Sequence, residues 1–201
     1  MARTGMTDLI ATLRGMTESG TADWTLGTVS FWSDNHVQDV LDLHRKDYVF
    51  QELMPYPTQG SGGTVLYNQY RAPVGNFEQT TGGTAIFYVQ DGTGANVGTA
   101  LYSVDYVRGV VTFASNTRGT SYFLTGSSYD LNAAAADIWN RKASHYAASA
   151  FNFSTDNHSV SREAIHQHCM QMAAKFESLS GDSIQSVQLW RNDTDGCIDD
   201  D

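Results

Sequence analysis

Apolar residues near the start of the chain recur at the spacing of an amphipathic helix. The first set follows the i, i+3, i+4, i+7 pattern and comprises Met6, Leu9, Ile10, Leu13 and Met16. A second helix is expected to begin at Ser33, a suitable N-cap, with Asp34 in the first turn where a carboxylate favours the helix dipole. One face of this second helix carries Val37, Val40, Leu41, His44 and Tyr48. We therefore expect it to extend through Tyr48.

The middle of the chain has the composition of strands and turns rather than of helices. Residues 49–125 hold all 3 prolines and most of the 18 glycines, together with many aromatic residues, and contain no lysine. Strands are expected over Thr64–Tyr70, Thr84–Gln90, Ala100–Val107, Val110–Ala114 and Ser121–Thr125. Residue pairs suited to tight turns lie at Asp91-Gly92, Arg108-Gly109 and Arg118-Gly119. Tight turns favour antiparallel neighbours, so we expect an antiparallel meander, as a small sandwich or barrel.

The helical period returns after Asp130. One face of the expected helix carries Leu131, Ala134, Ala135, Ile138, Trp139 and Tyr146. Asp137 and Arg141 stand four residues apart and are expected to form an ion pair on that helix. A loop over 152–158 then leads to Ser159, a suitable N-cap for a last helix. The apolar seam of that last helix comprises Ile165, Cys169, Met172, Phe176 and Leu179.

The final segment differs from the helices that precede it. Ile184 to Trp190 alternates apolar and polar residues as a strand does, without a neighbouring strand in the sequence to pair with, and Asp193 to Asp201 is acidic. The predicted class is α+β. It has a four-helix core from residues 1–48 and 126–180, an antiparallel β module inserted at 49–125, and an extended C-terminal tail at 181–201. An insertion is favoured over two separate domains because neither helix pair alone would bury both of its apolar faces.

Charge and composition narrow the classes of function. The formal net charge is −10 with 12 Lys+Arg in 201 residues, whereas a protein that grips the nucleic-acid backbone needs a basic stripe. No apolar stretch approaches the roughly 18 residues of a membrane span. The first residues lack the apolar core of a signal peptide, so synthesis and use in a cytoplasm are expected. In that reducing compartment Cys169 and Cys197 are expected to be free thiols.

Short patterns that resemble metal or nucleotide sites fail on their spacing. His166 and His168 precede Cys169, but helical residues two apart point away from one another. Asp193-Thr194-Asp195-Gly196 resembles a calcium loop and lacks its distal glutamate. Gly92-Thr93-Gly94 is followed by a strand rather than by a helix that could hold a phosphate. We therefore expect neither a metal nor a cofactor.

The β module also offers groups that could act on or bind a carbohydrate. The carboxylates available for a hydrolytic pair are Glu52, Glu78, Asp91 and Asp105. We expect them at strand edges and turns, where they would support solubility, and an enzyme is not expected. The tyrosines available for a sugar platform are Tyr67, Tyr70, Tyr88, Tyr102 and Tyr106. Packing in a core with the hydroxyls at its rim is the favoured interpretation of these tyrosines.

Four local phrases stand out along the chain. They are Ser33-Asp34 followed by Val37, Leu41 and Arg45; Ala135-Ala136-Asp137-Ile138-Trp139; Ala147 to Phe153 running into Ser154-Thr155-Asp156-Asn157; and Val187-Gln188-Leu189-Trp190-Arg191-Asn192-Asp193. With the order of elements, over most of residues 5–195, they resemble the head-to-tail adaptor proteins of tailed bacteriophages, also called head-completion or connector proteins. The large segment at 49–125 departs from the smallest, purely helical members.

The resemblance implies a structural virion protein that forms a homo-oligomeric ring of twelve subunits beneath the portal, at the neck of the virion. C-terminal segments would reach into the portal protein, while other loops meet the next neck or tail-completion protein. The residues expected to dock onto the portal are Ile184, Val187, Leu189, Trp190 and Arg191. DNA would pass through the ring without specific binding, and the subunit would occupy the host cytoplasm during assembly.

Physical arguments agree with the resemblance at three points. A lone strand-like segment is explained if it docks onto another chain. Trp190 and Arg191 are residue types that anchor interfaces. An acidic wall would repel the DNA backbone and let it slide. Other interpretations stay open: a disordered tail, acidity that serves solubility alone, a carbohydrate- or receptor-binding β module, and a hydrolase.

Overall fold

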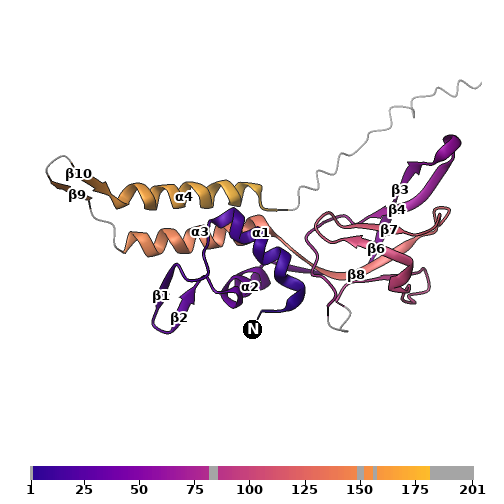
Figure 1. Cartoon of the computed structure of the whole chain (residues 1–201), viewed down its shortest axis with the longest axis horizontal. Helices are drawn as coiled ribbons and strands as arrows, with labels where there is room; N and C mark the ends of the chain where they lie inside the picture. The colour runs from indigo at the N-terminus through magenta and orange to yellow at the C-terminus, as the bar shows by residue number, and fades with distance from the viewer. Residues whose placement is uncertain (1, 82–85, 149–151, 156–157, 182–201) are drawn as a thin grey trace, which may run out of the picture.

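The computed structural model describes residues 2–81, 86–148, 152–155 and 158–181. These residues form a mixed α+β fold with four α-helices and a curled antiparallel sheet, which confirms the predicted class (Figure 1). The elements in chain order are η1 Thr4–Met6, α1 Thr7–Thr17, β1 Trp24–Leu26, β2 Val29–Phe31, α2 Asp34–Leu43, β3 Arg45–Gln59, η2 Ser61–Gly63, β4 Val65–Arg71, β5 Tyr88–Gln90, η3 Thr99–Leu101, β6 Tyr102–Asp105, β7 Val110–Phe113, β8 Tyr122–Tyr129, α3 Leu131–Ala147, β9 Asn152–Thr155, β10 His158–Ser161 and α4 Arg162–Leu179.

Two helices, α2 and α3, begin where the sequence supplies a capping side chain. The predicted N-cap at Ser33 is confirmed, because its hydroxyl accepts the backbone N–H of His36 at 3.3 Å. Asp130 caps α3 by accepting the N–H groups of Asn132 and Ala133, each at 3.0 Å. These side chains satisfy N–H groups that the first turn of a helix leaves unpaired.

Two helix boundaries differ from the prediction. The second helix, α2, ends at Leu43 rather than at Tyr48, because the chain from Arg45 onward pairs with β8. At the start of this pairing the N–H of Asp130 donates to the carbonyl of His44 at 3.1 Å. The last helix, α4, begins at Arg162 rather than after Ser159, which lies in β10. The segment expected to be a loop contains β9 and the start of β10, which pair with each other.

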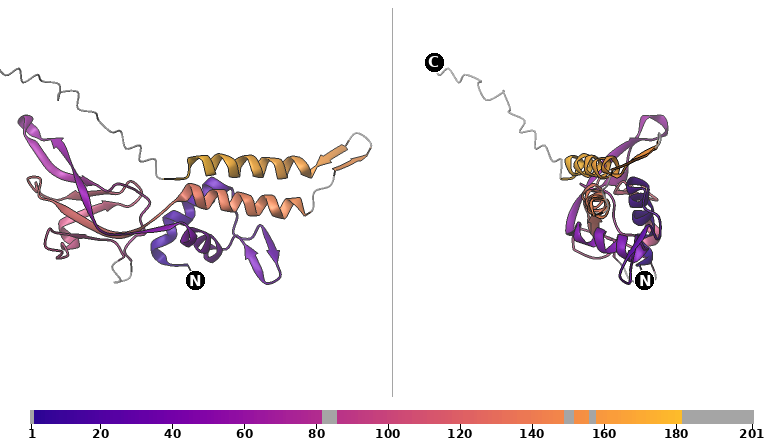
Figure 2. Two further views of the ribbon diagram at one scale, coloured as in Figure 1. Left: turned by 180° about the vertical axis from the view of Figure 1, so that it is seen from behind. Right: turned by 90° about the vertical axis from the view of Figure 1, so that its left-hand side faces the viewer.

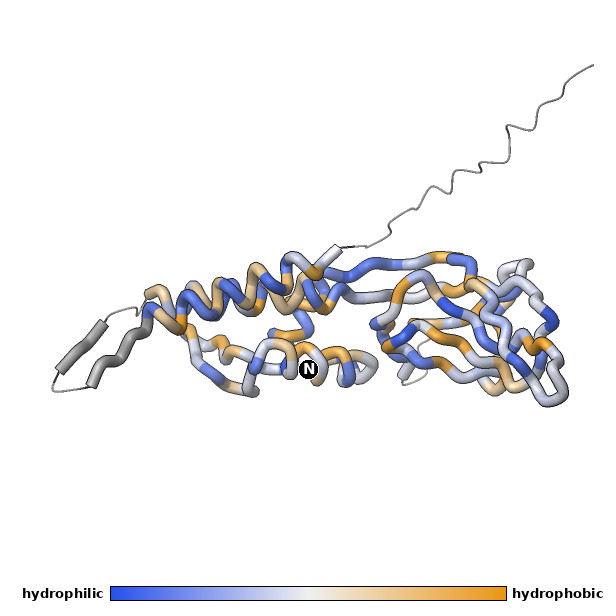
Figure 3. The backbone as a smooth tube through the Cα atoms, turned by 90° about the horizontal axis from the view of Figure 1, so that it is seen from above, coloured by the Kyte–Doolittle hydropathy of each residue, from blue (hydrophilic) through white to orange (hydrophobic). Residues whose placement is uncertain are grey.

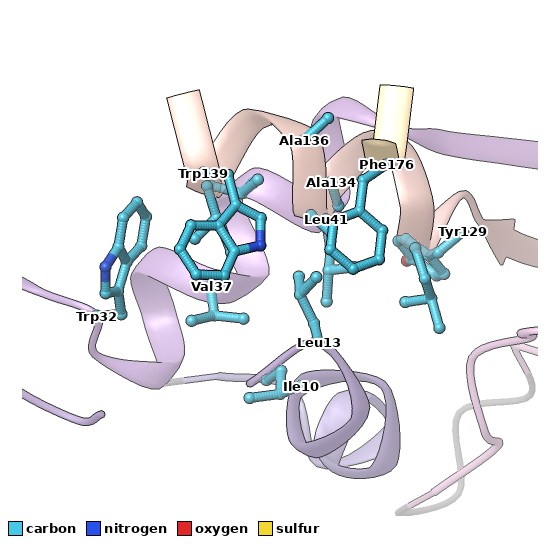
Figure 4. Packing of buried hydrophobic residues seen from close by; sticks show 14 of the residues in the cluster. Ile10, Leu13, Trp32, Val37, Leu41, Tyr129, Ala134, Ala136, Trp139 and Phe176 are labelled. Carbon is cyan, nitrogen blue, oxygen red and sulfur yellow. The ribbon is translucent and has the colours of Figure 1, made fainter. Parts of the chain in front are cut away.

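The two longest helices, α3 and α4, lie side by side and antiparallel (Figures 1 and 2). Apolar and polar residues are interleaved along this helical part of the chain (Figure 3). One buried cluster draws apolar residues from α1, α2, α3 and α4, and in Figure 4 Leu13, Val37 and Phe176 point into it from different helices. Residues separated by most of the chain therefore share one apolar interior. No helix of the described ranges is long and apolar enough to cross a membrane.

The main sheet has the strand order β5-β8-β3-β4-β7-β6, with every pair antiparallel. Antiparallel pairing was predicted correctly, but the meander was wrong, because β8 lies between β5 and β3. The Arg108-Gly109 turn joins the paired strands β6 and β7, as expected. The central strand, β3, was not predicted, since its sequence opens with Arg45-Lys46-Asp47 and contains two prolines.

A second apolar cluster lies within the curl of the sheet. It comprises Leu53, Tyr70, Phe77, Phe87, Val89, Val111, Phe113 and Leu124. The Tyr70 hydroxyl lies 2.5 Å from the Thr117 hydroxyl and donates to the Thr120 carbonyl at 2.8 Å. Tyr102 and Tyr106 pack against the same cluster at its edge. The interpretation of these three tyrosines as core residues is therefore confirmed.

Candidate functional site

The residues predicted to dock onto a portal lie outside the described residues. They are Ile184, Val187, Leu189, Trp190 and Arg191, and Cys197 lies outside as well. The last described residue, Gly181, donates its N–H to Asp130 Oδ2 at 3.2 Å. The Asn132 side chain donates to the carbonyl of Leu179 at 3.2 Å. The point from which the C-terminal segment continues is therefore beside the N-terminus of α3.

The four candidate carboxylates occupy different local settings. Asp91 lies in the turn after β5, where its Oδ1 accepts the N–H of Thr93 at 2.8 Å. Asp105 accepts the N–H of Arg108 at 3.1 Å, and Glu52 is exposed on β3. Glu78 was expected at the surface, and that was wrong: it is 1% exposed. A buried carboxylate requires partners, because burial without them is costly.

Glu78 belongs to an ionic joint between the N-terminal segment, α2 and the sheet. The Arg3 guanidinium donates to Glu78 Oε1 at 2.9 Å and to the two oxygens of Asp42 at 2.6 and 2.9 Å. The Tyr129 hydroxyl, at the end of β8, donates to Glu78 Oε2 at 2.7 Å. These partners are far apart in sequence, so no local pattern could have revealed the joint.

The electrostatics of the ionic joint favour a structural role. The hydrogen bond to Asp42 raises the pKa of the Arg3 guanidinium. Burial favours a higher pKa for Asp42, but the hydrogen bonds from Arg3 and Gln38 and the charge of Arg3 together outweigh it and lower the pKa below the ordinary value. Burial, assisted by the hydrogen bond to Glu78, raises the pKa of Tyr129. Arg3, Asp42 and Tyr129 therefore all titrate away from neutral pH, and none is suited to acid–base catalysis there.

The histidines and cysteine of α4 have separate surroundings. His166 Nδ1 lies 3.0 Å from the carbonyl oxygen of Ala143, and the His168 ring meets the Trp139 ring edge to face at 5.8 Å. Cys169 is a free, buried thiol whose pKa is raised by burial. Among the residues that the structure describes, no group of three His, Cys, Asp or Glu side chains is placed to hold a metal ion.

An open pocket lies between the β1–β2 hairpin and the C-terminal half of α3. Its volume is about 400 Å³ and its walls are mostly apolar. We call it the hairpin pocket. The residues that line it are Trp24, Leu26, Phe31, Arg141, Ser144, His145 and Ala148. Leu26 at its rim is 72% exposed. Large exposed apolar groups beside a concave surface are typical of an interaction site.

The Trp24 ring contacts three other rings in and beside the hairpin pocket. It stacks on the ring of His145, with centroids 4.3 Å apart, and on that of Phe31, at 5.2 Å. The ring of Trp32, a fully buried residue, is nearly perpendicular to that of Trp24, with centroids 5.5 Å apart. These contacts hold the short hairpin against α3, so the aromatic wall is in place before any ligand binds.

Arg141 gives the hairpin pocket a positive charge. Its expected ion pair with Asp137 is wrong, because Asp137 Oδ2 instead lies 2.8 Å from His44 Nε2. Arg141 Nη1 lies 3.2 Å from His36 Nε2, and burial together with the charge of Arg141 lowers the pKa of His36. No carboxylate within the described ranges forms an ion pair with Arg141.

A second exposed apolar surface lies at the other end of the molecule. Beyond Leu53 the strands β3 and β4 project as a hairpin, the β3–β4 arm (Figures 1 and 2). Met54, Tyr56 and Val65 of this arm are 68%, 45% and 56% exposed. The Arg71 guanidinium lies 4.2 Å from the centre of the Tyr56 ring, which makes the arm an aromatic and cationic surface.

The described residues thus define an elongated α+β chain with exposed apolar surfaces toward both ends and a partly buried ionic joint between its helices and its sheet. No family model, curated protein or solved structure matches the chain. Its function must therefore be inferred from the sequence and from the chemistry of these surfaces.

Proposed function

We propose that this protein is a structural, non-enzymatic adaptor that joins the head of a tailed bacteriophage to its tail. The observation that carries the proposal is the separation of the hairpin pocket from the β3–β4 arm. A connecting protein binds a different neighbour at each end, and exposed apolar surfaces of this kind are typical of protein interfaces.

In this proposal the four helices form one core, and the β module is inserted into it. The buried cluster to which all four helices contribute supports that interpretation. Subunits form a ring of twelve at the neck, in contact with the portal on one side and a neck or tail-completion protein on the other. The net charge of −10 favours a channel that repels the DNA backbone.

The C-terminal segment is the proposed portal anchor. It offers Ile184, Val187, Leu189, Trp190 and Arg191, of which the tryptophan and the arginine are common anchors of protein interfaces. The β3–β4 arm is proposed to meet the next protein of the neck, since Met54 and Tyr56 expose apolar surface there.

The tyrosines of the β module do not support a carbohydrate- or receptor-binding platform. Tyr70 is fully buried, and Tyr102 and Tyr106 are partly buried against the same cluster. These three rings pack the interior of the sheet, so the five tyrosines do not present one exposed platform.

The test is the mass of the full chain with and without its portal protein, measured by native mass spectrometry. We expect a complex that holds several copies of the chain per portal ring. Trp190→Ala and truncation after Gly181 should abolish attachment and leave the far-ultraviolet circular dichroism spectrum of the folded subunit unchanged, whereas the neighbouring Gln188→Ala should attach normally. Unimpaired attachment of the truncated chain, or a single copy in assembled particles, would refute the proposal.

A further inference from the structure

The hairpin pocket has a defined chemistry but no occupant among the described residues. Its walls are aromatic and aliphatic, and Arg141 has no carboxylate partner in the part of the chain that the structure describes. Its volume of about 400 Å³ is that of a site for a ligand-sized group. A matching occupant is therefore a large apolar side chain followed closely by carboxylates.

The chain itself contains a segment with this chemistry. Leu189 and Trp190 are followed by Asp193 and Asp195, and the sequence ends in Asp199-Asp200-Asp201. Only Arg191 is basic among residues 182–201. An indole suits the aromatic wall, and the aspartates complement the Arg141 guanidinium, which has no carboxylate partner among the described residues.

The point where this segment begins is close enough to the hairpin pocket. Gly181 is held beside Asp130 at the start of α3, and the pocket is lined by residues of the same helix near Ser144. Roughly 14 residues of helix separate Asp130 from Ser144, which is about 21 Å at ~1.5 Å per residue. The nine residues from Gly181 to Trp190 extend to about 30 Å at ~3.3 Å per residue.

We propose that the hairpin pocket binds the C-terminal segment of its own chain, with the Trp190 indole against Trp24 and Phe31 and an aspartate beside Arg141. Attachment within one chain gives an effective concentration in the millimolar range, so a modest intrinsic affinity is sufficient. The contact covers apolar side chains that the free subunit would otherwise expose.

The intramolecular contact does not depend on the proposed function. Only the consequence of this contact for assembly rests on the proposed function. If the portal binds the same segment, it competes with the hairpin pocket for Trp190. The free subunit then keeps both its anchor and the hairpin pocket covered. When the portal binds the segment, the pocket becomes free for a neighbouring protein.

The test is ¹⁹F NMR of the full chain labelled with 5-fluorotryptophan, in which the 4 tryptophans give separate resonances. The Trp190 resonance is the one that disappears in Trp190→Phe. We expect it to be protected, with a small solvent isotope shift between water and D₂O. Ala148→Phe, which fills the pocket, should move it to the position of an exposed indole.

Ala147→Phe is the matched control. Ala147 is the exposed neighbour of Ala148 on α3 and does not line the pocket. The Ala147→Phe substitution should leave the Trp190 resonance at its position in the unaltered chain. Ser144→Phe provides a second filling variant if Ala148→Phe lowers the melting temperature. Arg141→Gln should reduce the ratio of docked to free segment by about fivefold, the effect of roughly 1 kcal/mol from one lost ion pair.

Three results would overturn the proposal. A fully exposed Trp190 in the unaltered chain would show that the pocket does not hold it. An equal change of the Trp190 resonance in Ala147→Phe and Ala148→Phe would show that the change does not come from filling the pocket. A Trp190 resonance that becomes exposed on dilution would assign the occupant to a second copy of the chain. All three are read on the isolated subunit, so a failure to bind the portal is a separate result.

Discussion

Glu78→Gln tests whether the ionic joint holds the helices to the sheet. The carboxylate accepts hydrogen bonds from Arg3 Nε at 2.9 Å, Arg3 Nη2 at 3.3 Å and the Tyr129 hydroxyl at 2.7 Å. Glutamine preserves the shape, but it removes the charge and replaces one acceptor with an NH₂ group that faces donors. Breaking a fully buried ion pair costs about 3–5 kcal/mol.

The expected loss is smaller here, because the Arg3 side chain is 37% exposed and keeps its second partner, Asp42. Screening by solvent and the remaining pair reduce the expected loss to about 2 kcal/mol. In a chain of this length such a loss lowers the melting temperature by roughly 4–8 °C.

The assay is unfolding of the full chain by heat and by urea, followed by circular dichroism. The matched control is Glu52→Gln, an exposed glutamate on β3, which should change stability by no more than about 0.5 kcal/mol. A double-mutant cycle with Tyr129→Phe should give a coupling energy on the order of 1 kcal/mol. Equal stability of the two glutamine variants would show that the ionic joint does not stabilise the contact between the helices and the sheet.

The remaining predictions concern two residues of the β module and one histidine of α2. Gly109→Ala should destabilise the fold by about 2 kcal/mol, because Gly109 has φ +64° and a Cβ there would collide with the carbonyl of Val74; Gly92→Ala, where a Cβ meets no atom, is the control in the same denaturation assay. Tyr70→Phe should lower the free energy of unfolding in urea by about 1 kcal/mol, because it removes the hydroxyl that bonds the Thr117 hydroxyl and the Thr120 carbonyl. An unchanged free energy would show that these hydrogen bonds add no net stability. The pKa of His36 in the folded chain is below its ordinary 6.5, so the unfolded chain binds a proton here at higher pH than the folded chain does. The contribution of His36 to stability should therefore be fully present above pH 6.5 and be lost as the pH falls below it. His36→Gln should flatten that part of the plot of melting temperature against pH.

Local sequence patterns determined much of the secondary structure. The start of α2 at Ser33 and the apolar face of α1 depend on residues within a few positions, so spacing and capping chemistry are sufficient. The turn at Arg108-Gly109 depends on a glycine with positive φ, which is also a local requirement. For the same reason the α+β class was accessible from the sequence.

Only the tertiary structure decided the features that depend on distant partners. Arg45 continues as strand rather than helix because it pairs with Tyr129, and Glu78 is buried because Arg3 and Tyr129 bond to it. Arg141 faces an aromatic pocket because Asp137 pairs with His44 instead. Hydrophobic period and local propensity describe a residue's neighbours along the chain, whereas strand pairing, ionic partners and pockets depend on neighbours that only the folded chain brings together.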